Sequence, residues 1–157
     1  MGVPIFIVGF TAVGKSTYGK TFAKKNNLPF IDLDKLIEEQ SGISISTMFT
    51  RFGEDYFRKQ ESEILKTVPI EASVVACGGG TACFFDNMDW MNANGKTIYL
   101  KAPLKFILNN IRQSQTNKRP LIKGKSDVAI VAWAELLFAE REPHYLKAQE
   151  IIETKNI

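Results

Sequence analysis

The clearest chemical signal lies in residues 9–17, which read Gly-Phe-Thr-Ala-Val-Gly-Lys-Ser-Thr. They fit the pattern G-x-x-x-x-G-K-S/T, in which Lys15 reaches the β- and γ-phosphates of a nucleotide and the Ser16 hydroxyl binds Mg²⁺. An apolar, β-branched run at residues 3–8 predicts a buried strand before this loop, and residues 16–25 predict a helix after it. Because strand, loop and helix is the setting that the pattern requires, the segment predicts a nucleoside triphosphate site. The residues expected to contact the triphosphate are Ala12, Val13, Gly14, Lys15, Ser16 and Thr17.

Two carboxylates, Asp32 and Asp34, stand at the end of a second predicted strand, with one residue between them. Strand alternation would put both on one face, at the edge of a parallel sheet where such folds bind ligands. One carboxylate could hold Mg²⁺ while the other accepts a proton from an attacking hydroxyl. Asp34 could instead cap the following helix. The neighbouring phosphate loop favours the catalytic interpretation.

Arg58 lies beside two aromatic residues on a helix expected over residues 46–66. Phe49 and Phe57 are eight residues apart and would share a face of that helix. An arginine next to an aromatic wall suits a bidentate grip on a carboxylate. Arg58 also follows Glu54 by four residues, as in an exposed ion pair, and spacing alone favours that plainer interpretation.

For three further features, the sequence is compatible with both a functional and a structural interpretation. Gly78, Gly79 and Gly80 follow a third predicted strand, where they could let a ligand approach the backbone or simply form a tight turn. Arg119 lies in a polar, basic stretch and could fold over a transferring phosphate or remain solvated. Arg141 could grip an anion or place a favourable charge at the end of a helix.

Strand-like and helix-like segments alternate along the chain, which predicts a three-layer α/β domain with a parallel sheet between helices. One domain is expected over residues 1–157, with a helical substrate-binding region at about 34–66 and a lid at about 112–126. The expected strands are residues 3–8, 29–33, 73–77, 97–100 and 150–153. The expected helices are residues 16–25, 34–40, 46–66 with Ser46 as N-cap, 85–94, 104–113 and 127–141.

Composition and charge limit the kinds of binding partner and the cellular compartment that we expect for this protein. The net charge is +3 with dispersed Lys and Arg, so nothing indicates a nucleic acid partner. No apolar run approaches the roughly 20 residues of a membrane span, and no charged segment precedes the first strand as in a signal peptide. Cys77 and Cys83 are too few for a disulfide framework, so we expect reduced thiols in a cytoplasmic protein. A monomer is expected, because no exposed apolar stripe demands a partner.

Taken together, the motifs resemble those of the shikimate kinase family of small P-loop kinases, over residues 1 to about 154. Beyond the phosphate loop, the matching motifs in family order are Asp32-x-Asp34, Met48-Phe49, Gly-Glu-x-x-Phe57-Arg58-x-x-Glu61, Gly78-Gly79-Gly80, Arg119-Pro120-Leu121 and Arg141-x-Pro-x-Tyr145. The resemblance implies a five-stranded parallel sheet of the nucleoside-monophosphate-kinase type. It also implies phosphorylation of the 3-hydroxyl of shikimate by ATP.

The resemblance assigns roles on the acceptor side of the reaction. Asp34 would contact the shikimate hydroxyl and act as its base, and the two arginines would hold the shikimate carboxylate. The residues that would bind or enclose shikimate are Asp34, Arg58, Gly79, Arg141, Phe49 and Phe57.

On the donor side, the resemblance implies that Lys15 and Arg119 stabilise the phosphoryl group in transfer, with Arg119 also contacting ATP. Ser16 and Asp32 would serve Mg²⁺. One departure stands out, because Ala12 occupies a position where the family usually has a loop glycine. A positive φ there would be strained.

Two other functions remain open at this point. The same fold could phosphorylate a different small hydroxylated metabolite, such as gluconate or a nucleoside monophosphate. Alternatively, the chain could be a non-catalytic sensor that keeps the kinase fold. The complete set of charged motif residues counts against the sensor.

Overall fold

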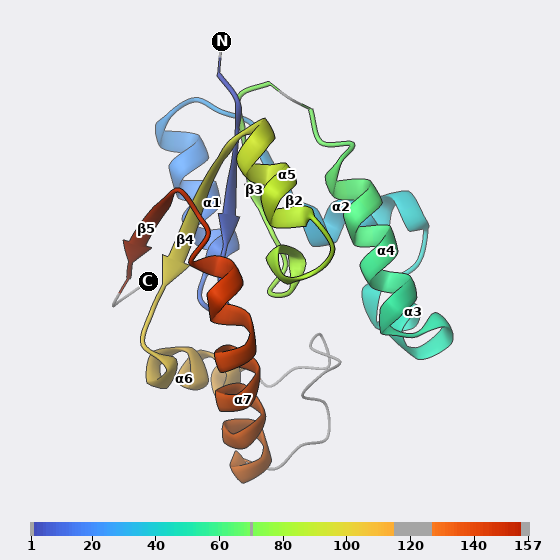
Figure 1. Cartoon of the computed structure of the whole chain (residues 1–157), viewed down its shortest axis with the longest axis vertical. Coiled ribbons are helices and arrows are strands. Elements are labelled where there is room, and N and C mark those ends of the chain that lie inside the picture. The colour runs from blue at the N-terminus through green and yellow to red at the C-terminus, as the bar shows by residue number, and fades with distance from the viewer. Residues whose placement is uncertain (1, 70, 115–126, 155–157) are drawn as a thin grey trace.

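The computed structural model describes residues 2–69, 71–114 and 127–154, and within them five parallel strands form one sheet (Figure 1). The strand order is β2-β3-β1-β4-β5, with β1 in the centre. The strands are β1 (Pro4–Val8), β2 (Phe30–Asp32), β3 (Ser73–Ala76), β4 (Lys96–Lys101) and β5 (Glu150–Glu153). This confirms the predicted five-stranded parallel sheet.

Helices cover both faces of the sheet, with α1 on the far side in Figure 1 and α5 in front. Beyond β2 and β3, the helices α2, α3 and α4 stand together. The helices are α1 (Lys15–Lys25), α2 (Leu33–Ser41), α3 (Ile45–Phe52), α4 (Glu54–Leu65), α5 (Asn87–Asn94), α6 (Leu104–Ser114) and α7 (Asp127–Tyr145), with a short 3₁₀ turn η1 (Thr81–Cys83).

The central strand β1 is covered on both faces and is deeply buried. Phe6 and Ile7 of β1 are fully buried. Phe6 lies between Val75 of β3 and Thr97 of β4, and Ile7 lies between Ala76 of β3 and Ile98 of β4. A strand covered on both faces needs apolar residues at consecutive positions rather than at alternate ones. This explains why the apolar run before the phosphate loop predicts β1 well.

The single helix expected over residues 46–66 is wrong. Gly53 adopts a φ of +87° and separates α3 from α4. Its N–H group bonds to the carbonyls of Met48 and Phe49, as at a helix end. The predicted N-cap Ser46 is also wrong, because the Ser44 hydroxyl accepts from the Thr47 N–H at 3.1 Å.

Other boundaries shift less. The helix predicted from residue 85 begins at Asn87, since Phe85 has a φ of +51° that a helix does not allow. The last long helix continues past Arg141 to Tyr145. Of the lid expected at about 112–126, residues 112–114 form the end of α6, and the rest lies outside the described residues.

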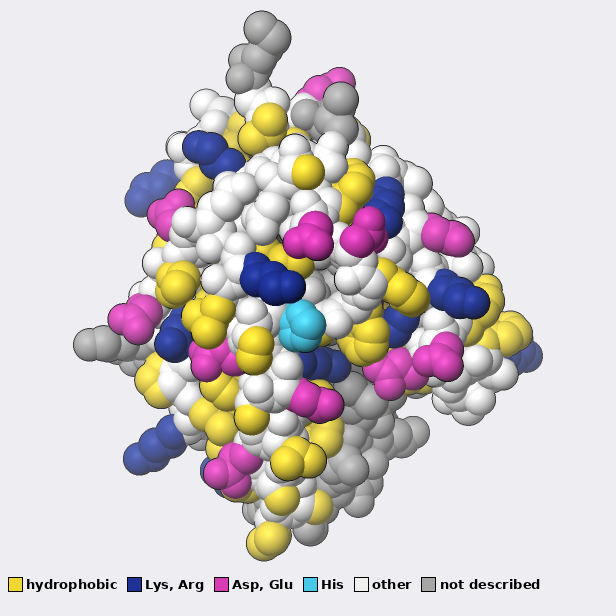
Figure 2. All heavy atoms as spheres, in the orientation of Figure 1, with side chains coloured by type: hydrophobic (Ala, Val, Ile, Leu, Met, Phe, Trp, Pro, Cys, Tyr) yellow, Lys and Arg dark blue, Asp and Glu magenta, His cyan; other side chains and the backbone are white. Residues whose placement is uncertain are grey.

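The surface in Figure 2 carries acidic and basic side chains mixed together, with apolar side chains scattered among them. Within the described ranges, none of the helices combines the length and the apolar character that a membrane crossing needs.

Candidate active site

A cavity of about 1080 Å³ opens where the carboxyl ends of β1, β2 and β3 meet. Its walls come from the phosphate loop, from α2, α3 and α4, from residues 77–80 after β3, and from α6 and α7. The predicted site residues that line it are Ala12, Gly14, Lys15, Ser16, Thr17, Asp32, Asp34, Phe49, Phe57, Arg58, Gly79 and Arg141. The structure therefore gathers the predicted donor and acceptor residues at one cavity.

Two predicted residues stand apart from this set. The Val13 side chain is buried in the core beneath the loop and does not line the cavity. Arg119 lies outside the described residues, so its predicted role stays a prediction.

The phosphate loop closes on itself around Lys15. The Lys15 ammonium donates to the carbonyls of Gly9 and Phe10 at 2.8 Å each. Gly14 precedes α1 with a φ of +106°, and no side chain caps that helix. Uncapped N–H groups at the start of a helix are suited to an anion, so the loop has the geometry of a phosphate site.

Asp32 holds two neighbours at the edge of the cavity. One carboxylate oxygen accepts from the Ser16 hydroxyl at 3.2 Å, and the other accepts from the Lys35 N–H at 3.3 Å. Asp32 is therefore the N-cap of α2. The alternative that Asp34 caps this helix is wrong.

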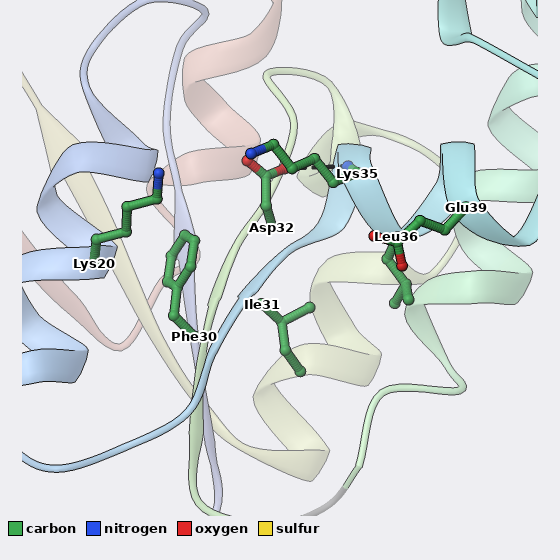
Figure 3. Close-up of a pocket in the computed structure, with 7 residues that line it drawn as sticks. All are labelled: Lys20, Phe30, Ile31, Asp32, Lys35, Leu36 and Glu39. Carbon is green, nitrogen blue, oxygen red and sulfur yellow. Dashed lines mark hydrogen bonds between the residues drawn. The ribbon is translucent and has the colours of Figure 1, made fainter.

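A smaller pocket of about 260 Å³ lies on the other side of Asp32, between α1 and α2 (Figure 3). Lys20 stands beside the Phe30 ring there, with its ammonium 5.9 Å from the ring centroid. The lysines Lys20 and Lys35 in its wall are balanced by the acids Asp32 and Glu39. This pocket therefore lacks the net charge that would mark an ion site.

Asp34 is a carboxylate of the cavity whose pKa is raised toward neutrality. It stands in the first turn of α2, enclosed by protein but open to the cavity. Burial raises the pKa of Asp34 from 3.8 to about 6, with the negative charges of Glu61 and Asp32 adding to the effect and Lys15 opposing it. A carboxylate with a pKa near neutrality is an effective general base.

Arg58 is buried, contrary to the plainer interpretation of its spacing. The expected ion pair with Glu54 exists at 3.1 Å, but Arg58 is only 5% exposed and lines the cavity. Its guanidinium lies 4.3 Å from the Phe84 ring centroid and 5.0 Å from that of Phe57. Aromatic faces on a buried arginine hold the guanidinium in one orientation.

Glu61 belongs to the motif that contains Arg58, but no role for it follows from the sequence. It is fully buried, and its two oxygens contact Arg58 at 3.1 Å and the Thr81 hydroxyl at 2.8 Å. Burial raises the pKa of Glu61, while Arg58 and the bond from Thr81 oppose this. Its place three residues after Arg58 was the available signal, because such residues share a helix face.

The aromatic wall forms across two helices rather than on one. Phe49 belongs to α3 and Phe57 to α4, and their ring centroids lie 5.0 Å apart. The prediction that they share a wall is correct, but the single helix from which it was derived does not exist.

Gly79 lies at the junction of the phosphate loop and α7. A Cβ there would collide with the Thr11 hydroxyl and come within 3.4 Å of the Arg141 guanidinium. The Tyr145 hydroxyl donates to the Gly79 carbonyl. Arg141 itself is buried and faces the cavity, which favours the anion-binding interpretation over a charge at a helix end.

The cavity wall also includes residues that no motif indicated, among them Asn110 on α6 and Trp133 on α7. The Asn110 amide donates to the Ala12 carbonyl at 3.0 Å. Ala12 has a φ of +67°, so it does adopt the positive φ that would be strained for a residue with a Cβ.

The chain matches known proteins over most of its length. A family model described as shikimate kinase matches residues 11–157. This chain belongs to the shikimate kinase family. A shikimate kinase of Bacteroides thetaiotaomicron is 39% identical over 150 residues, which cover 95% of this chain and 85% of the relative.

Solved shikimate kinases have the same fold. A crystal structure of shikimate kinase from Bacteroides thetaiotaomicron superposes with a TM-score of 0.90 at 38% identity, covering 96% of this chain and 86% of that one. A shikimate kinase from Acinetobacter baumannii in complex with shikimate gives a TM-score of 0.89 at 28% identity, covering 100% of this chain and 86% of that one. The chain is therefore an enzyme of the P-loop kinase fold, and the matches give no support to a gluconate acceptor.

Proposed function

We propose that the cavity carries out the reaction of the family, the transfer of the γ-phosphoryl group of ATP to the 3-hydroxyl of shikimate, with Asp34 as the base. The observation that carries the proposal is the juxtaposition of a carboxylate of raised pKa with the phosphate loop and two buried arginines around one cavity. A phosphoryl acceptor needs a base, and its donor needs cations.

Asp34 takes the proton of the attacking hydroxyl. With a pKa of about 6, its carboxylate is ionised at neutral pH and still basic enough to accept a proton. The Gly78 backbone packs against this carboxylate, since a Cβ there would lie 2.9 Å from Asp34 Oδ1. Close packing holds the base in one place and favours transfer to one hydroxyl.

Arg58 and Arg141 bind the carboxylate of shikimate. A guanidinium has five N–H donors, and the contacts of Arg58 with Glu54 and Glu61 leave donors for a third acceptor. Two fixed guanidinium groups orient a planar carboxylate better than ammonium groups would. Phe49 and Phe57 enclose the ring of the substrate and keep water from it.

The donor half consists of the phosphate loop and its cations. The residues proposed to bind ATP are Ala12, Val13, Gly14, Lys15, Ser16, Thr17 and Arg119. Lys15 would exchange its contacts with the loop carbonyls for phosphate oxygens. Lys15 and Arg119 would neutralise charge on the group being transferred, which is the main requirement of this chemistry.

Ser16 and Asp32 are suited to bind Mg²⁺. Their oxygens lie 3.2 Å apart at the mouth of the loop, and Mg²⁺ is usually bound by one or two carboxylates together with phosphates and water. Among the described residues, no three His, Cys, Asp or Glu side chains form a metal cluster, so phosphates would supply the remaining ligands. The bound ion would neutralise phosphate charge.

We also propose that the enzyme works as a cytoplasmic monomer. Residues of a single copy of the chain line both the donor side and the acceptor side of the cavity, so the proposed site does not require a second copy. Cys77 and Cys83 are both free, as expected in a reducing compartment.

The test is ADP release, measured by a coupled assay with Mg-ATP. Shikimate should support turnover, whereas gluconate and a shikimate analogue without the carboxylate should not, because the N–H donors of the arginines that face the cavity would be left without their substrate acceptor. Absence of turnover with shikimate would refute the proposal. Tight shikimate binding without turnover would revive the non-catalytic sensor.

A further inference from the structure

Ala12 holds a backbone conformation that residues with a Cβ, other than Asn, rarely adopt. It is the third residue of a turn closed by the Val13 N–H on the Phe10 carbonyl at 3.2 Å, and its φ is +67°. Thr11, the second residue, is not among the residues of positive φ. A positive φ at only the third position is the pattern of a type II turn, which normally requires Gly or Asn there.

The turn is supported from two directions. On one side, Thr11 packs against the backbone of Gly79, where a Cβ would come within 3.1 Å of the Thr11 nitrogen. On the other side, the Asn110 amide of α6 donates to the Ala12 carbonyl at 3.0 Å. This bond fixes the orientation of the peptide between Ala12 and Val13 from a helix 98 residues away in the sequence.

We propose that Asn110 is a positioning residue for the nucleotide, which it serves by holding the left-handed backbone of Ala12. A glycine at position 12 would adopt this conformation at no steric cost. With alanine, the conformation needs external support, and the bond to the Ala12 carbonyl supplies it. Asn110 then raises nucleotide affinity through the shape of the loop, because a loop already in its binding conformation spends less binding energy on ordering.

The inference rests on the proposed role of the loop in binding ATP. Asn110 also lines the cavity, so it has an alternative role as a direct contact of the nucleotide. The two roles differ in their dependence on residue 12. Support of a strained turn becomes unnecessary when position 12 is glycine, whereas a direct contact keeps its value in either background.

The experiment is a double-mutant cycle of Asn110→Ala with Ala12→Gly. The dissociation constant for ADP is measured by titration without shikimate, and the KM values for ATP and shikimate are measured in the coupled assay. Asn110→Ala alone should raise the ADP dissociation constant and the ATP KM about three- to tenfold, the value of one neutral hydrogen bond, with the shikimate KM unchanged. In the Ala12→Gly background the same substitution should change ADP affinity less than about twofold.

The matched control is Asn109→Ala, which removes an exposed asparagine from the same helix and should change neither constant. If Asn110→Ala impairs folding, as judged by its melting temperature, Asn110→Leu removes the donor while keeping the shape of the side chain. Equal losses in both backgrounds would overturn the inference in favour of a direct contact. Unchanged ADP affinity in Asn110→Ala would overturn it as well. An inactive wild-type protein that still binds ADP would instead refute the proposed function.

Discussion

Replacing Asp34 by asparagine is expected to abolish turnover and at the same time to stabilise the protein. Asn cannot accept the proton of the hydroxyl, so kcat should fall by about two to four orders of magnitude, the usual value of a general base. Asn has nearly the shape of Asp and carries no charge. The fold therefore loses a carboxylate whose ionised form is disfavoured by burial and by the charges of Glu61 and Asp32.

The size of the gain follows from the pKa of Asp34. Its rise from 3.8 to about 6 means that the folded state binds the proton more tightly than the unfolded state. Above pH 6 the ionised carboxylate destabilises the fold, and this destabilisation disappears as the pH falls toward 4. The difference corresponds to at most about 3 kcal/mol at neutral pH, and water in the cavity reduces it. A gain of that order raises the melting temperature by about 4–12 °C in a domain of this size.

Urea or thermal unfolding at pH 7.5 and at pH 4 measures the gain, and the coupled assay measures turnover. Asp34→Asn should be more stable than the wild type at pH 7.5, and the two should converge at pH 4. The exposed Asp55 of α4 provides the control, because Asp55→Asn should leave both stability and turnover unchanged. A variant no more stable than the wild type at pH 7.5, or equally stabilised at both pH values, would refute the electrostatic reasoning. Near-normal turnover would refute the role of Asp34 as base.

Three further predictions use the same assay. In the wild type, kcat/KM for shikimate should fall about tenfold per pH unit below pH 6, where Asp34 becomes protonated, and a flat profile down to pH 5 would contradict the raised pKa. Arg58→Lys should raise the shikimate KM about 10- to 100-fold, because the variant loses charge-assisted hydrogen bonds to the substrate carboxylate. The control Arg51→Lys, at an exposed position, should leave the KM unchanged. A KM of Arg58→Lys within twofold of the wild type would contradict the proposed binding of the carboxylate by Arg58. Gly79→Ala should lower kcat/KM at least about tenfold, because the added Cβ collides with the phosphate loop. The control is Gly42→Ala, where nothing lies within 4 Å of the added Cβ, and it should affect stability alone. Equal kinetics in the two variants would contradict the packing argument.

The parts predicted well from the sequence are those in which a local pattern has one structural solution. The apolar run of β1 and the glycine-bounded loop after it are such a case, since only a covered strand and a phosphate loop satisfy both patterns. The break at Gly53 was missed for the opposite reason, because the local pattern there fits both one continuous helix and two helices. Apolar and aromatic residues continue at helical spacing across it, and a lone glycine is tolerated inside a helix.

The spacing of residues in the sequence could not predict contacts between segments that are far apart along the chain. Asn110 and Ala12 are 98 residues apart, and the bond between them exists only because α6 returns beside the phosphate loop. Glu61 is a different case. Its position on the same helix face as Arg58 could be predicted from the sequence, whereas its contact with Thr81 could not. An acidic residue one helical turn from an arginine usually forms a solvated ion pair with it, and only the fold places both Arg58 and Glu61 in the wall of the cavity.

The glycine run after β3 is a local sequence pattern whose role depends on contacts with distant segments. Its sequence was equally compatible with a tight turn and with a ligand on the backbone. The structure supports a third explanation, in which each glycine makes room for a different part of the site. A Cβ would meet the Asp34 carboxylate at Gly78, the phosphate loop at Gly79 and, at 2.6 Å, the Arg58 guanidinium at Gly80. Asp34, the phosphate loop and Arg58, which we propose as the base, the donor site and a carboxylate-binding group, come this close to one stretch of backbone because no side chain stands between them. Three consecutive glycines are costly in conformational entropy, and at this position the convergence of the site on the backbone explains why a fold keeps them.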